Sequence, residues 1–198
     1  ARLPAVRAGA MTKAIDILMQ EHRVIERVLD ALETAAGHLE RSHAVRPEFF
    51  LDAADFIAGF ADGCHHRKEE GVLFGAMIES GAPSPGGAID MMLDEHERGR
   101  AFTRAMRDGA RRLQGGDAEA RRQVVTNARG YVALLRDHIA KEDEMLFPMA
   151  DELLSAERQD EMLRGFEQVD RQDAGEGANE KFLALAARLA LEAKALGA

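Results

Sequence analysis

The amino-acid sequence predicts an all-α protein that folds as an antiparallel, up-and-down four-helix bundle with additional short C-terminal helices. The composition favours helix over strand, because Ala, Leu, Met, Arg and Glu are abundant while aromatic residues make up only 5%. Apolar residues recur at spacings of three and four in four long segments, and no segment has the period of two that is typical of strands. Clusters of Gly and Pro separate these segments.

Turn and capping residues indicate the boundaries of the four long helices. Thr12 and Asp117 are good N-cap residues for the first and the fourth helix. The second helix ends at Gly81, which a Pro- and Gly-rich loop follows, and the third ends at Gly115 and Gly116. The four helices are therefore expected at residues 12–39, 47–80, 88–115 and 117–154.

A length of 198 residues is compatible with one domain and an extension. We expect an N-terminal arm or expression remnant, the bundle, and a C-terminal helical extension, at residues 1–10, 11–154 and 155–198. Within the extension, composition and periodicity predict short helices at 156–169 and 180–195, with a loop at 173–177. These helices would lie across the bundle or pack on a partner, such as a second copy in a homodimer.

The net charge of −9, with its cations scattered along the chain, argues against nucleic acid and anionic membranes as partners. No apolar run approaches the roughly 20 residues of a membrane span, and the start lacks a signal-peptide core. The single cysteine, Cys64, cannot form an internal disulfide. We therefore expect a cytoplasmic protein.

A histidine interrupts the apolar face of each long helix, at His22, His65, His96 and His138. Any one such histidine is more often a core residue than a ligand. At a rise of about 1.5 Å per residue, however, all four fall at about the same height in an up-and-down bundle. The sequence therefore predicts that four imidazoles converge on one point.

Two of these histidines are followed by a glutamate four residues later, His65 by Glu69 and His138 by Glu142. Residues four apart lie on the same helix face, so each pair directs an imidazole and a carboxylate toward the same space. A buried carboxylate needs a counter-charge or a metal. A mixed nitrogen and oxygen site suits iron, manganese or zinc, and two carboxylates on facing helices are placed to bridge two ions. Otherwise the glutamates would turn outward or pair with Lys68, Lys141 or Arg100.

Four segments together resemble the haemerythrin-like, histidine-histidine-glutamate (HHE) cation-binding family over roughly residues 11–154. They are EHRVIERVL at 21–29, HHRKEEGVLF at 65–74, DEHERGR at 94–100 and HIAKEDEMLFP at 138–148. The resemblance implies a non-haem di-iron site with bound Fe2+ or Fe3+ ions and dioxygen, nitric oxide or peroxide as small ligands. By this resemblance the ligands of the irons are His22, His65, His96 and His138, with Glu69 and Glu142 as bridging carboxylates.

The sequence departs from the family's oxygen carriers at two positions. Arg100 stands where the carriers have a fifth histidine, and their second bridging carboxylate would correspond to Asp143 rather than Glu142. The four-residue spacing of His138 and Glu142 is more similar to the non-carrier branch, which includes eukaryotic iron-sensing relatives.

Two further residues are candidate ligands in place of the missing histidine. His66 follows His65 but lies about 100° round the helix from it, so solvent exposure is the alternative. Glu26 lies one turn beyond His22, as a ligand or as an acceptor for an imidazole N–H.

Three functions are compatible with this pattern. The first is a metal-binding protein with two iron ions, or with zinc or manganese, that senses, binds or buffers iron, oxygen or nitric oxide. The second is a di-iron enzyme that reduces peroxide or oxygen. The third is a structural helical module without metal.

Overall fold

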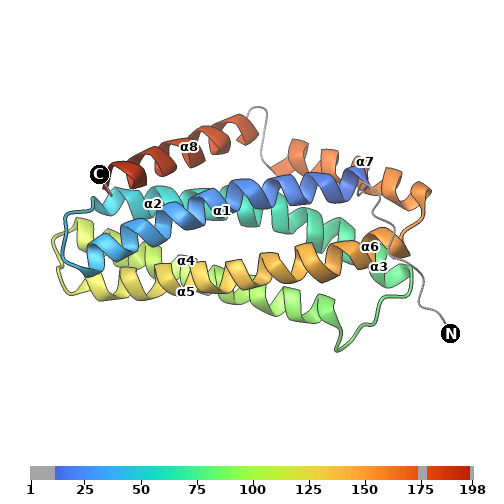
Figure 1. The fold of residues 1–198 in the computed structure, drawn as a ribbon, viewed down its shortest axis with the longest axis horizontal. Coiled ribbons are helices and arrows are strands. Elements are labelled where there is room, and N and C mark those ends of the chain that lie inside the picture. The colour runs from blue at the N-terminus through green and yellow to red at the C-terminus, as the bar shows by residue number, and fades with distance from the viewer. Residues whose placement is uncertain (1–11, 174–177, 197–198) are drawn as a thin grey trace.

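The computed structural model describes residues 12–173 and 178–196, and these residues form helices with no strand among them. Four helical runs lie lengthwise beside one another as an antiparallel bundle, which confirms the predicted fold class (Figure 1). The runs are α1 (Lys13–Glu40), then α2 (Pro47–Phe56), η1 (Ile57–His66), η2 (Glu69–Leu73) and α3 (Phe74–Glu79), then α4 (Ala88–Gln114), then α5 (Ala120–Lys141), η3 (Glu142–Leu146) and α6 (Phe147–Leu153). None of the helices described combines the length and the apolar character needed to cross a membrane.

The C-terminal extension contains α7 (Ala156–Asp173) and α8 (Ala178–Leu196), both longer than predicted. The N-terminal arm predicted at 1–10, and residues 174–177 of the predicted loop, lie outside the described residues.

The second and fourth helical runs contain π-helical segments, η1 to η3, where the sequence predicted plain helices. A π-helix has i→i+5 hydrogen bonds and a wider turn than an α-helix, and such segments are frequent at functional sites. Two of these segments begin at the paired glutamates, η2 at Glu69 and η3 at Glu142. The same irregularity therefore occurs at equivalent points of two helices.

The two predicted N-cap residues behave differently from each other. Thr12 precedes α1, but its hydroxyl donates to the Gln159 side chain on α7 at 2.8 Å instead of capping the helix. The fourth run begins at Ala120, and Asp117 accepts a hydrogen bond from the Glu119 amide at 3.1 Å, as a capping side chain does, and also pairs with Arg112. Only at α1 does a contact with another helix replace the expected side-chain cap.

The apolar core is divided into two clusters along the bundle. One includes Leu29, Phe50 and Leu135, and the other includes Leu18 and Phe147. A layer of buried polar side chains separates the two apolar clusters. Its members are His22, His65, His66, Lys68, Glu69, Glu95, His96, His138 and Glu142. Such a layer is costly to bury unless its groups find partners.

The two extension helices pack on the bundle. Helix α8 contacts α1 and α2 and runs alongside them, while α7 contacts α1, η1 and η2 near the other end (Figure 1). Met162 and Phe166 of α7 join the cluster that contains Leu18. Gly59 allows α8 to approach closely, because a Cβ there would lie 1.9 Å from the ring of Phe182.

The packing of α8 predicts unequal effects for two of its leucines. Leu189 is fully buried, so Leu189→Ala should lower the free energy of unfolding by about 2–5 kcal/mol, as other buried leucine truncations do. Leu191 is 70% exposed, and Leu191→Ala should change that free energy by less than about 0.5 kcal/mol. Urea denaturation of the two variants measures the difference. Equal effects would show that α8 does not pack on the bundle in solution.

Candidate metal centre

The six side chains that the sequence predicts as ligands meet in the buried layer, and each is at most 1% exposed. Each of the four helical runs contributes one of these histidines. The two glutamates are the first residues of η2 and η3. The residues are His22 from α1, His65 from η1, Glu69 from η2, His96 from α4, His138 from α5 and Glu142 from η3.

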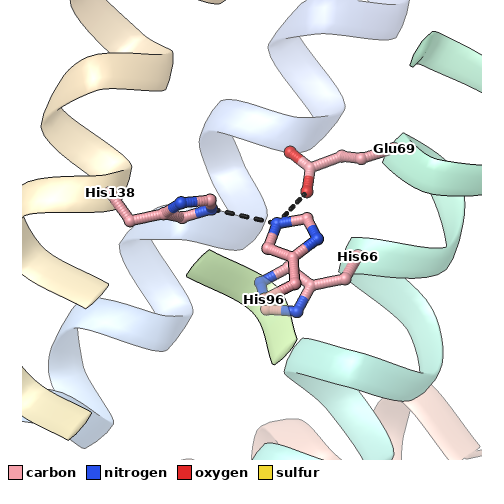
Figure 2. A group of neighbouring side chains, drawn as sticks. All are labelled: His66, Glu69, His96 and His138. Carbon is pink, nitrogen blue, oxygen red and sulfur yellow. Dashed lines mark hydrogen bonds and ion pairs between the residues drawn. The ribbon is translucent and has the colours of Figure 1, made fainter. Parts of the chain in front are cut away.

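The buried side chains form two groups, each with four potential ligand atoms within 4.8 Å of one another. The two-histidine group comprises His22, His65, Glu69 and Glu142. The three-histidine group comprises His66, Glu69, His96 and His138. Figure 2 shows the three-histidine group, in which the imidazoles of His96 and His138 face each other and Glu69 points at His96. Glu69 belongs to both groups, as a ligand shared by two neighbouring ions would.

Glu69 lies between the two groups with one oxygen directed at each. Its Oε1 is 3.4 Å from Nε2 of His65, and its Oε2 is 3.5 Å from Nε2 of His96. The carboxylate can therefore contact an ion in either group.

Glu142 also reaches both groups. Its Oε2 is 3.2 Å from Nε2 of His22 and 3.3 Å from Nε2 of His138. Asp143, the alternative carboxylate at this place, lies instead 2.7 Å from the far nitrogen of His22, Nδ1. The structure thus brings Glu142 into the centre of the cluster and places Asp143 behind an imidazole.

His66 lies inside the cluster, although it directly follows His65. Its side chain is buried, its ring stacks on that of His96 at 3.8 Å, and its Nε2 has no hydrogen-bond partner. The wide turn of η1, which ends at His66, reduces the angle between successive side chains and so brings both histidines toward the bundle interior. A fifth imidazole therefore joins the four that the sequence places at one height.

Glu26 and Arg100 lie outside both groups. The carboxylate of Glu26 is 3.2 Å from Arg23 and its side chain is 38% exposed. Arg100 pairs with Glu70 at 2.6 Å and with Glu97 at 2.7 Å. The structure therefore does not bring Glu26 to the other candidate ligands.

Five carboxylates surround the cluster, one at the Nδ1 of each of its histidines, and the sequence analysis considered only Asp143 among them, as a possible bridging carboxylate. The pairs are His22 with Asp143 at 2.7 Å, His65 with Glu21 at 3.0 Å, His66 with Asp62 at 2.9 Å, His96 with Glu70 at 2.7 Å and His138 with Glu95 at 2.9 Å. A carboxylate accepts the Nδ1 proton of an imidazole, which leaves the Nε2 lone pair facing inward.

A sequence signal for four of these carboxylates existed, because each adjoins a candidate ligand in the chain. Glu21 and Glu95 precede histidines, and Glu70 and Asp143 follow glutamates. Each one, however, pairs with a histidine on a different helical run. Adjacency identifies the carboxylates, but only the packing of the helices decides the pairs.

The inward-facing atoms of the cluster are short of partners. Seven of them are buried without a hydrogen bond, namely Nε2 of His22, His65 and His66 and both oxygens of Glu69 and of Glu142. Unpaired polar atoms in a protein interior are costly and uncommon. Cations bound in the two groups would give these atoms partners.

The pKa shifts of Glu69 and His65 also fit a cation, although burial is outweighed by carboxylate partners that raise the pKa of His22 and of His138. Burial and the nearby charge of Glu142 raise the pKa of Glu69 well above its usual value. Burial, followed by the neighbouring His22, lowers the pKa of His65 to about 4, which favours the neutral, ligating form of the imidazole. The set of imidazoles and carboxylates suits iron, manganese or zinc.

Comparison with known proteins agrees with this geometry. Three curated relatives are an uncharacterized protein of Mycobacterium bovis and two uncharacterized proteins of Mycobacterium tuberculosis, each 24% identical over 159 residues. The match covers 80% of this chain but only 62% of each relative, so the chain spans less than two thirds of their length. The family model described as "Hemerythrin HHE cation binding domain" matches residues 13–150, which include every residue of the two groups. The chain therefore belongs to the hemerythrin HHE cation-binding domain family.

Proposed function

We propose that this protein holds a non-haem di-iron site with which it senses, binds or buffers iron, dioxygen or nitric oxide. The observation that carries the proposal is the set of seven inward-facing imidazole and carboxylate atoms without a hydrogen-bond partner. Membership of a cation-binding family supports a metal at this place. Iron is our choice among the metals that suit the donor set, and it follows the family resemblance.

Each of the two groups would hold one ion. The two-histidine group would hold one through His22 and His65, and the three-histidine group would hold the other through His66, His96 and His138. Glu69 and Glu142 would bridge the pair, because each of them faces imidazoles of both groups. Two irons would supply redox chemistry and coordination positions for a small molecule.

The other residues of the centre have supporting roles. The five outer carboxylates orient the imidazoles through Nδ1, and the apolar clusters on either side exclude water from the layer. His66 raises the number of imidazoles from four to five, although Arg100 stands at the position of the oxygen carriers' fifth histidine. The number of imidazoles also differs between the groups, which favours binding of a small ligand beside His22 and His65.

A first prediction concerns metal content. Anaerobic reconstitution with Fe2+ should give two irons per chain by elemental analysis, and the double variant His65→Ala/His138→Ala should retain fewer than one, because each group loses an imidazole. His38→Ala is the matched control, because His38 lies far along α1 from His22 and its ring contacts that of His43. Fewer than one iron in the unchanged protein would contradict the proposal and favour a structural module.

A second prediction separates His66 from Glu26. His66→Ala should weaken the binding of one iron by at least about 10-fold. Loss of a residue that only hydrogen-bonds to a metal ligand already costs about that much, and loss of a ligand should cost no less. Glu26→Gln should leave both affinities unchanged, because Glu26 lies on the surface beside Arg23. Competition with a coloured Fe2+ chelator measures both. Equal affinities in the two variants would remove His66 from the ligand set.

A third prediction concerns small ligands. The iron-loaded protein should give stable optical changes with nitric oxide, with azide after oxidation, or with dioxygen, and these changes should be lost in His22→Ala. Hydrogen peroxide serves as the contrast. Rapid catalytic consumption of peroxide, without a stable adduct of any of these ligands, would contradict a sensing or binding role and indicate a di-iron enzyme.

A further inference from the structure

A chain of charged side chains leads from His65 outward to the C-terminal extension. Nδ1 of His65 is 3.0 Å from Oε2 of Glu21, whose other oxygen accepts from Nζ of Lys68 at 2.5 Å. Nζ of Lys68 lies 2.8 Å from Oδ1 of Asp170 on α7. Both oxygens of Glu21 are thus engaged, one by the imidazole and one by the ammonium.

The other half of the bundle contains a corresponding chain in a different environment. Nδ1 of His138 is 2.9 Å from Glu95, which pairs with Lys141, and Lys141 is 2.6 Å from Asp137. Asp137 lies on the same helix as Lys141 and is 69% exposed, so this last link is an ordinary surface pair of small energetic value.

Lys68 differs from Lys141 because it is completely buried. Its ammonium lies between two carboxylates, Glu21 at 2.5 Å and Asp170 at 2.8 Å, which supply the negative charge that a buried cation needs. The ring of Phe166, also on α7, lies 6.0 Å from the ammonium. Without Asp170 the buried ammonium would retain Glu21 as its sole carboxylate among the pairs of the described residues. A buried charge that loses a partner is strongly destabilised.

We propose that Asp170 is a positioning residue of the metal centre. Through Lys68 and Glu21 it fixes the orientation of the His65 imidazole and so strengthens metal binding in the two-histidine group. This role rests on the di-iron function proposed above, and it makes α7 part of the centre although the family match ends at residue 150. Asp137 has no comparable role.

The first arm of the test measures metal affinity. Fe2+ is titrated anaerobically, against a coloured chelator, into the full chain and into Asp170→Asn, Asp170→Glu and the control Asp137→Asn. Loss of an outer partner of a metal ligand typically weakens binding about 10- to 100-fold, and Asp170 acts through two intervening residues. We therefore expect Asp170→Asn to weaken one iron about 10-fold, Asp170→Glu to recover part of this loss, and Asp137→Asn to stay within about twofold.

The second arm observes the imidazoles in metal-free protein. Nitrogen NMR of the histidine rings reports which ring nitrogen carries the proton and how firmly it is hydrogen-bonded. Asp170→Asn should change the ring signals of His65 and leave those of His138 in place, because the two chains are separate. Thermal unfolding of the same samples gives the change in stability, which a purely structural contact would also produce.

Two results would overturn the role of Asp170. One is that Asp170→Asn matches Asp137→Asn in both arms. The other is that it lowers thermal stability while iron affinity and the His65 signals stay unchanged, so that Asp170 merely anchors α7. If the unaltered protein binds no iron, the proposed function fails, and the NMR arm alone then decides whether Asp170 orients His65.

Discussion

The structure depends on the pairing of buried imidazoles with carboxylates in one layer of the bundle. Each of five histidines has a carboxylate at Nδ1, between 2.7 and 3.0 Å away, and so directs Nε2 toward the interior. Glu69 and Glu142 face the same space, and none of their carboxylate oxygens has a hydrogen-bond partner. This accumulation of lone pairs and negative charge is unfavourable in an apolar interior unless a cation neutralises it. The apolar clusters on either side supply the packing energy that keeps the layer closed.

The layer is built twice from one pattern. In each half, a helix with the pair Glu-His faces a helix in which a histidine, a lysine, a glutamate and a second acidic residue follow one another within six positions. Hydrogen bonds also join the two halves, because Glu70 of one half pairs with His96 of the other, and Asp143 pairs with His22. His66 breaks the duplication, since Ile139 occupies the corresponding position after His138. The extra imidazole makes the two groups chemically unequal.

The C-terminal extension is joined to this layer by more than apolar contact. Helix α8 contributes Leu189 and Ala186 to one cluster and α7 contributes Phe166 to the other. Helix α7 also places the carboxylate of Asp170 against the buried ammonium of Lys68. Helix α7, which lies beyond the matched family region, thereby contacts the side chains that hold His65. The equivalent side chains beside His138 end at the surface with Asp137.

The sequence by itself determined the bundle and the positions of most candidate ligands within it. Helical periodicity and turn residues located the helices, and the spacing of His65 with Glu69 and of His138 with Glu142 placed these side chains on interior faces, because helix geometry is local and regular. Only the tertiary structure decided which side chains meet. The sequence did not predict the π turns that bring His66 inward or the exposure of Glu26. The pairing of Glu21 with His65, rather than with its neighbour His22, arises from a contact between two helical runs. Such contacts join residues far apart in the chain, and local patterns carry no information about them.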